Sequence, residues 1–463
     1  MALSIDTQLT PAALQPAITK LFEVSAVKIK QIEKDWDPAD GTPVFTDNGK
    51  YTTRGWTEWT QGFQFGSAIL QFDATGEREF LELGRDKTVE LMASHVSHIG
   101  VHDHGFNNVS TYGNLLRLML EGKIEANQRE RDFYELALKV SGAVQAARWS
   151  PIEDGSGFVH SFNGPHSLFI DTIRSMRALG VAHKLGHCLM ADHDERVSLL
   201  ERLIEHSVNT AQYGVYYGEG RDAYDVWGRT AHESVFNMND GRYRCPNSQQ
   251  GFSPFTTWTR GLSWAMCGFP EQLEFLDTID DSEIAERIDP QEIRQIFLKA
   301  ARATCDFYID NSCTDGVPLW DTGALNVHKL GDYMSKPSDP FNPWEPVDGS
   351  AAAIGAQGLI RLGRYLRGRG DEADGTRYFQ AGLSVAKTLF EEPYLSTDPD
   401  HHGLNLHAIY HRPNGWDTIR EGQTIPNGES AMWGDYHLRE LALLIQRLAK
   451  EGPYLTFFGC VDG

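Results

Sequence analysis

The stretch Asp348-Gly349-Ser350-Ala351-Ala352-Ala353-Ile354, continued to Leu366, carries the apolar spacing on which the fold prediction rests. Its large apolar residues recur every three to five positions, so they share one face of an α-helix that packs against a core. These residues are Ile354, Leu359, Leu362 and Leu366. The segment from about Gly428 to Lys450 repeats the pattern and predicts a second such helix. Its apolar positions are Leu438, Leu441, Ile445 and Leu448.

Further helices are predicted in both directions along the chain from this stretch. The segment Asp132–Val144 is expected to bury one stripe, made of Phe133, Leu136, Val140 and Val144. Asn163-Gly164-Pro165 places a proline where a first helical turn belongs, and Gly180 follows where a C-cap belongs. Helices are predicted to begin near Pro11, Trp59, Arg78, Asn108, Glu130, Pro165, Asp194, Ser253, Asp289, Asp348, Asp371 and Asn427.

About twelve helices, few convincing strands and no short repeat favour an all-α toroid, with an inner and an outer ring of helices. An irregular helical array would give the same periodicity. Three long connections are rich in Gly, Pro, Asn, Asp and aromatic residues, and loops of this length usually carry function. They span Gly214–Ser253, Asn311–Asp348 and Glu391–Asn427, and short hairpins are compatible with them. We expect one domain over residues 1–463, with these loops forming a cup.

Composition narrows the possible partners and the location. The 463 residues carry a net charge of −22, from 64 acidic and 42 basic residues. This balance argues against nucleic acid, an anionic membrane surface and long polyanions, but a short anionic oligosaccharide remains possible. No apolar run approaches the roughly 18–20 residues of a membrane span, and no signal peptide is evident. Six scattered cysteines without a CxxC pair fit a reducing cytoplasm.

The stretch Gln250–Trp264 combines side chains that suit an anionic sugar. The indoles of Trp258 and Trp264 can stack on a pyranose ring, and the Arg260 guanidinium can pair with a carboxylate. Gln250 offers both a donor and an acceptor to hydroxyl groups. An equally weighted interpretation makes the indoles core aromatics at a helix start. If the stretch is a sugar clamp, Trp258 and Arg260 face the cup while Leu262 and Met266 face the core.

Two carboxylates and a histidine are the acid–base candidates. Asp103 lies between two histidines in a loop before the helix predicted near Asn108, and a capping or solvated role is the alternative. Asp171 is predicted inside a helix among apolar neighbours, which would raise its pKa toward that of a general acid. The alternative places Asp171 in solvent beside Arg174. A loop position such as that of His232 is more often structural.

Metal and nucleotide motifs have little support. His183 and His187 fall one turn apart near Cys188, but no HExxH motif and no acidic third ligand accompany them. The sequence contains no GxSxG, GxxxxGK[ST] or GxGxxG pattern. We therefore predict no metal and no nucleotide cofactor.

The order of short motifs resembles the unsaturated glucuronyl hydrolases of glycoside hydrolase family 88. These motifs are Trp59-Thr60-Gln61-Gly62-Phe63, His102-Asp103-His104-Gly105-Phe106, Ile170-Asp171-Thr172, Gln250-Gly251-Phe252, Trp258-Thr259-Arg260-Gly261 with Trp264, Leu319-Trp320-Asp321, Asp348–Ile354 and Trp433-Gly434-Asp435-Tyr436. Each match is weak alone, but together they cover most of the chain in order. The resemblance implies an (α/α)6 toroid related to the family 105 unsaturated rhamnogalacturonyl hydrolases.

The resemblance also implies a reaction and a set of roles. The family hydrates the C4=C5 vinyl ether of an unsaturated uronate, without a metal or cofactor, and thereby releases it from lyase-generated oligosaccharides. Asp171 is similar to the family's general acid/base, and Asp103 to its second essential carboxylate. The expected substrate-binding residues are Trp59, His102, His232, Gln250, Trp258, Arg260 and Trp264. A monomer or homodimer in the cytoplasm is expected.

The chain departs from the family pattern at two places. Arg174 follows Asp171 where apolar residues and an asparagine are common, and His407–Trp416 replaces the expected small polar residues and lysine. The leaving-group subsite is therefore expected to be the chain's own. Three other functions remain open: an inverting glycosidase using both aspartates, whose carboxyls would lie roughly 6.5–9.5 Å apart, a histidine-based sugar epimerase or isomerase, and an inactive sugar-binding module.

Overall fold

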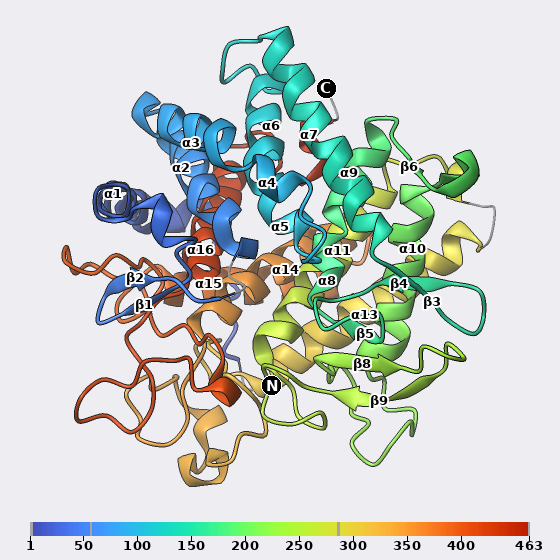
Figure 1. Cartoon of the computed structure of the whole chain (residues 1–463). Helices are drawn as coiled ribbons and strands as arrows, with labels where there is room; N and C mark the ends of the chain where they lie inside the picture. The colour runs from blue at the N-terminus through green and yellow to red at the C-terminus, as the bar shows by residue number, and fades with distance from the viewer. Residues whose placement is uncertain (1–2, 56–57, 285–287, 462–463) are drawn as a thin grey trace.

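The computed structural model describes residues 3–55, 58–284 and 288–461, and its helices form an (α/α)6 toroid (Figure 1). Within these residues, six inner segments form a closed ring, because each packs against the next and the last against the first. They are α2 (Gln61–Thr75), α5 (His104–Asn108) with α6 (Asn114–Leu120), α8 (Thr172–Ser175) with α9 (Arg177–Lys184), α11 (Thr259–Leu276), α14 (Gly349–Arg367) and α16 (Met432–Ala449).

An outer helix covers each inner segment, so the predicted alternation along the chain is confirmed. The outer helices are α1 (Gln15–Asp35), α3 (Arg78–Leu91), α7 (Gln128–Ala147), α10 (Leu199–Asn209), α13 (Pro290–Asn311) and α15 (Glu372–Leu389). Short helices α4 (Ala93–Val96) and α12 (Asp281–Ile284) lie in the connections. Apart from the start predicted near Pro165, each predicted start lies within about six residues of the start of a helix.

The strands belong to the loops between helices. Three antiparallel pairs are β1 (Phe45–Asp47) with β2 (Lys50–Thr52), β3 (Trp149–Pro151) with β4 (Gly157–Val159), and β6 (Leu189–Met190) with β7 (Arg196–Val197). A three-stranded sheet has the order β5 (Ser167–Phe169), β8 (Glu233–Phe236) and β9 (Tyr243–Asn247). Its register places Phe169 opposite Glu233. The long loop Gly214–Ser253 thus contains a hairpin that leads directly into the Gln250–Trp264 stretch.

The apolar stripe of the opening stretch lies in the core. Ile354, Leu359, Leu362 and Leu366 are all buried on α14. The Asp348 side chain accepts hydrogen bonds from the backbone N–H groups of Ser350 and Ala351, and so caps the helix. Most of the stripe on α16 is equally buried, whereas Leu448 is half-buried.

The stripe predicted on α7 was wrong. Phe133 is 40% exposed and Leu136 is 59% exposed, and the buried face carries Tyr134, Leu138 and other residues. The reason is close packing of α7 on α9, because a Cβ at Gly142 would lie only 2.4 Å from the Ala182 Cβ. The α7–α9 contact is made by small residues, and the face of α7 that carries Phe133 and Leu136 is turned outward.

The helix predicted at Pro165 was also wrong. Residues Ser167–Phe169 form β5, which pairs with β8, and helical structure begins only at Thr172. Gly180 is not a C-cap but lies inside α9, where a Cβ would meet the Phe275 ring at 3.1 Å. The secondary structure of this segment is determined by strand pairing with residues more than sixty positions away. Local proline and glycine signals carry no information about such pairing.

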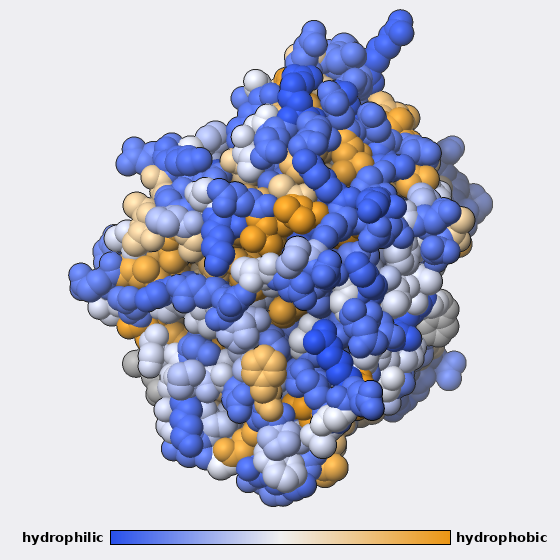
Figure 2. Space-filling model, turned by 90° about the vertical axis from the view of Figure 1, so that its left-hand side faces the viewer, coloured by the Kyte–Doolittle hydropathy of each residue, from blue (hydrophilic) through white to orange (hydrophobic). Residues whose placement is uncertain are grey.

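The surface that carries α1 and the β1–β2 hairpin is mostly hydrophilic, and its apolar side chains gather in separate areas (Figure 2). None of the helices in the described part of the chain combines the length and apolar character needed to cross a membrane. All six cysteines are free thiols, and four of them are buried.

Candidate active site

A cavity at the loop end of the toroid brings together most of the predicted site residues. The open space between the atoms that line it, together with the solvent at its mouth, is about 810 Å³. Eight of the nine predicted residues line it: Trp59, His102, Asp103, Asp171, Gln250, Trp258, Arg260 and Trp264. Chain segments from position 59 to position 264 therefore meet in one site.

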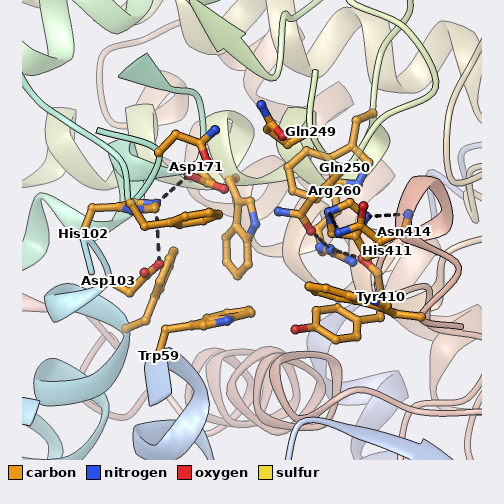
Figure 3. Close-up of a pocket in the computed structure, with 16 residues that line it drawn as sticks. Trp59, His102, Asp103, Asp171, Gln249, Gln250, Arg260, Tyr410, His411 and Asn414 are labelled. Carbon is orange, nitrogen blue, oxygen red and sulfur yellow. Dashed lines mark hydrogen bonds and ion pairs between the residues drawn. The ribbon is translucent and has the colours of Figure 1, made fainter. Parts of the chain in front are cut away.

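One side of the cavity is acidic. His102 Nε2 lies 3.3 Å from Asp171 Oδ1 and 3.7 Å from Asp103 Oδ1, so the imidazole lies between two carboxylates (Figure 3). Asp103 immediately precedes α5, as expected of a loop residue. Asp171 is not inside a helix, because it links β5 to the first turn of α8. All three side chains are buried, which strengthens the electrostatic coupling between them.

The two carboxyl groups titrate differently. Burial, reinforced by the neighbouring Asp171 charge, raises the pKa of Asp103 to about 6 although His102 opposes it. Burial also penalises ionised Asp171, but its hydrogen bond to His102 and the charges of His102, His232 and Arg260 outweigh this and lower its pKa. The expected rise in the Asp171 pKa was therefore wrong. Apolar sequence neighbours did not reveal the histidine that contacts the carboxylate.

The Asp103 pKa gives a stability prediction. Folding raises it from 3.8 to about 6, so the protonated form stabilises the fold at low pH and this contribution is lost as pH rises through 6. Asp103→Asn removes that loss, so at pH 8 the variant should gain up to about 3 kcal/mol in free energy of unfolding relative to wild type. Urea denaturation at pH 4 and pH 8 measures the difference. Equal relative stability at both pH values would contradict the assignment.

The opposite side of the cavity carries the guanidinium of Arg260, on the first turn of α11. Its Nη2 donates to Gln250 Oε1 at 2.6 Å and to the Tyr410 carbonyl at 2.9 Å, and its Nη1 donates to the Ile409 carbonyl. The guanidinium is also 4.7 Å from the ring centres of both Trp258 and Trp433. The guanidinium is thus fixed by the protein, and it lines the cavity, where it can meet a carboxylate.

The remaining wall residues agree with the orientation predicted for the Gln250–Trp264 stretch. Trp258 and Arg260 line the cavity, whereas Leu262 and Met266 are buried in the core. Trp264 also lines the cavity and packs against Phe106 at 4.8 Å between ring centres. The aromatic and cationic residues therefore contribute to one wall.

His232 lies behind this wall instead of lining the cavity. Its Nδ1 accepts hydrogen bonds from the backbone N–H groups of Gln249 at 2.8 Å and Gln250 at 3.3 Å. Its ring packs edge-on against Trp258 at 4.6 Å. Burial lowers the pKa of His232 to about 4, so the ring is neutral at neutral pH. The histidine holds the loop that presents Gln249 and Gln250.

No family model matches the chain. In sequence it is 24% identical over 446 residues to an unsaturated glucuronyl hydrolase of Bacillus sp. strain GL1, covering 94% of this chain and 97% of the relative. It is 23% identical over 386 residues to an unsaturated glucuronyl hydrolase of Formosa agariphila, covering 83% and 78%. An unsaturated chondroitin disaccharide hydrolase of Streptococcus pyogenes is 22% identical over 435 residues, covering 93% and 91%.

Solved structures agree in fold. The crystal structure of the Bacillus sp. GL1 unsaturated glucuronyl hydrolase superposes with a TM-score of 0.69 at 20% identity, covering 94% of this chain and 97% of that chain. The chain resembles the unsaturated glucuronyl hydrolases along nearly its whole length. The resemblance predicted from the motifs is thereby confirmed. An unsaturated glucuronyl hydrolase specific for heparin gives a TM-score of 0.70 at 18% identity, covering 94% and 98%.

Several lining residues were not predicted individually. Tyr410, His411, Asn414 and Trp416 come from the loop that departs from the unsaturated glucuronyl hydrolase pattern. Buried Asp417 fixes this loop by accepting from the backbone N–H groups of Tyr410 at 2.6 Å and His411 at 3.0 Å. Loop composition pointed to the segment but not to its members. The other unpredicted lining residues are Phe106, Phe162, Asn163 and Gln249.

Proposed function

We propose that the protein is an unsaturated uronyl hydrolase that releases a 4,5-unsaturated uronate from the non-reducing end of short, lyase-generated oligosaccharides. The observation that carries the proposal is the pairing of a carboxylate–imidazole–carboxylate group with a fixed guanidinium across one aromatic-walled cavity. The guanidinium suits the uronate carboxylate, and the acidic group suits proton transfer to its double bond.

In the proposed mechanism, Asp171 protonates C4 of the C4=C5 bond, and positive charge develops at C5 and the ring oxygen. Water then adds at C5 after giving a proton back to a carboxylate of the pair. The resulting hemiketal opens and expels the rest of the saccharide. Aromatic side chains around the reacting ring exclude other water molecules. Asp103 is the second carboxyl group of the pair, and it holds the His102 ring beside Asp171.

Although its pKa is lowered, Asp171 can gain a proton when the substrate binds. The positive charges of His102 and Arg260 both favour ionised Asp171. A bound uronate carboxylate would neutralise the field of Arg260, and imidazolium His102 lies 3.3 Å from Asp171 Oδ1. We propose that the proton passes from His102 to Asp171 as the substrate binds.

The mechanism predicts activity at acidic pH. The reaction begins with a proton held by the Asp103–His102–Asp171 group, and the raised pKa of Asp103 lies at about 6. We therefore expect kcat/KM to fall as pH rises through about 6, approaching a tenfold loss per pH unit. The measurement is kcat/KM between pH 4.5 and pH 8.5 in overlapping buffers. If kcat/KM instead rises as pH passes through 6, the active enzyme is the form in which Asp103 is ionised, and the prediction is wrong.

The direct test uses lyase digests of glycosaminoglycan, pectin, ulvan and gellan. Hydrolysis should remove the far-UV absorbance of the conjugated enol ether in at least one digest. No loss in any digest would overturn the proposal. Cleavage of saturated glycosides alone would favour the inverting glycosidase, and binding without turnover would favour the sugar-binding module. Loss of all activity in His232→Ala, with activity kept in Asp171→Asn, would favour the histidine-based epimerase, although His232 does not line the cavity.

The wider context is also proposed. We infer one catalytic domain that acts on small anionic saccharides in the cytoplasm. Six free thiols support a reducing compartment, and a single ring of helices that closes on itself supports one domain.

A further inference from the structure

A buried carboxylate outside the catalytic group organises the mouth of the cavity. Glu233, on β8, is only 1% exposed. Three side-chain amides donate to it: Asn163 Nδ2 at 3.2 Å, Asn247 Nδ2 at 2.6 Å and Gln249 Nε2 at 3.1 Å. Asn163 and Gln249 line the cavity, and Asn247 does not. Glu233 is therefore placed to act on the cavity through two of its neighbours.

The contacts with Glu233 fix which way the amides point. Burial raises the pKa of Glu233, but hydrogen bonds from Ser167, Gln249 and Asn163 outweigh this effect and lower the pKa, so Glu233 is ionised at neutral pH. An ionised carboxylate can only accept hydrogen bonds, so the NH₂ group of each amide must face it. Asn163 Oδ1 and Gln249 Oε1 are then turned away from Glu233, and neither accepts a hydrogen bond from the described residues.

Gln250 is oriented in the opposite sense. Its Oε1 accepts from Arg260 Nη2, so its NH₂ group is the one left for a ligand. Donors thus gather near Arg260, where a carboxylate would bind, while acceptors face the half-exposed mouth at Asn163 and Gln249. The inner and outer parts of the cavity therefore recognise different chemical groups.

The mouth also has no strong positive charge. Arg260 is the one arginine or lysine among the described lining residues, and it is buried. Burial and the field of Arg260 lower the pKa of His411 to about 4, so this ring is neutral at neutral pH. The nearby Arg54 donates to the Trp416 carbonyl and is not part of the lining. A sulfate ester, which carries acceptors only, would meet carbonyl oxygens here.

We propose that Glu233 is a positioning residue that turns the Asn163 and Gln249 carbonyls into the leaving-group subsite and so selects a neutral, hydroxyl-rich leaving sugar over a sulfated one. This inference rests on the proposed function. Sugar hydroxyls donate to the two carbonyls, whereas a sulfate in the same place leaves them unpaired and adds charge repulsion.

The first experiment compares substrates on the wild-type protein. The substrates are an unsaturated uronyl disaccharide, its 4- and 6-sulfated forms, and an aryl glycoside of the unsaturated uronate, which has no leaving-sugar hydroxyl. We expect kcat/KM for the unsulfated disaccharide to exceed that for each sulfated form by at least about tenfold. Aryl-glycoside hydrolysis together with equal or faster cleavage of a sulfated form would overturn the inference and leave the proposed function standing. Failure on all the substrates would overturn both.

The second experiment separates positioning from folding. In Glu233→Gln, the new NH₂ group attracts the carbonyl of a neighbouring amide, which then faces residue 233 instead of the cavity. The preference for the unsulfated disaccharide should therefore fall about fivefold or more, while kcat/KM for the aryl glycoside should change less than about twofold. Asn247→Ala is the matched control, because Asn247 shares Glu233 without lining the cavity, and it should retain the preference. Gln249→Ala, at a half-exposed position, tests the same contact if Glu233→Gln does not fold. An equal loss on every substrate would show a merely structural role.

Discussion

Asp171→Asn is expected to lower kcat by roughly 10³-fold, with a much smaller change in KM. Asparagine keeps the size of the side chain but cannot supply a proton to C4 or take one from water. The variant should therefore still bind an unsaturated disaccharide. The measurement is the initial loss of enol-ether absorbance at saturating substrate, with binding followed by calorimetry.

The control for this variant is its fold. Asp171 is 7% exposed, and its carboxylate contacts the His102 ring at 3.3 Å, so an isosteric amide should preserve the circular dichroism spectrum. The double variant Asp103→Asn/Asp171→Asn should lose little more activity than Asp171→Asn alone, because residues that act as a unit are not additive. Full activity in Asp171→Asn would overturn its role as the acid.

The helical ring was predictable because its evidence is local. The stripe through Ile354, Leu359 and Leu362 repeats with the helical period, and Asp348 supplies a cap, so one segment contains all the information needed. The α7 stripe failed because the buried face there is chosen by shape. Gly142 allows α9 to approach, and no periodicity of large residues records that contact.

The site was predictable where motif order fixed residue identities, and less so where distant contacts determine chemistry. His102, Asp103 and Asp171 meet as expected, but the low pKa of Asp171 depends on a histidine 69 positions earlier in the chain. Likewise Glu233 stands beside His232 in the sequence, yet its amide partners come from two other segments, the loop before β5 and the end of β9 with the residues that follow it. The orientation of a side chain that is set by such long-range contacts cannot be predicted from the residues next to it in the sequence.

Arg260→Met is expected to have two separable effects. The variant loses the guanidinium proposed to pair with the uronate carboxylate, so kcat/KM should fall by roughly 10²–10³-fold, mainly through KM. It also leaves Asp348, which is fully buried with Oδ2 3.7 Å from Arg260 Nη1, without its opposite charge. Breaking a buried pair in this way costs about 3–5 kcal/mol, so the melting temperature should drop by several degrees.

Asp348→Asn distinguishes these effects. Asp348 Oδ1 accepts from the N–H groups of Ser350 and Ala351, a capping role that asparagine can keep while its charge is removed. The double variant Arg260→Met/Asp348→Asn should therefore recover much of the melting temperature but none of the lost kcat/KM. If the double variant recovers activity as well as stability, Arg260 serves only the fold. Removing the negative charge of Asp348 cannot restore the binding of the uronate carboxylate.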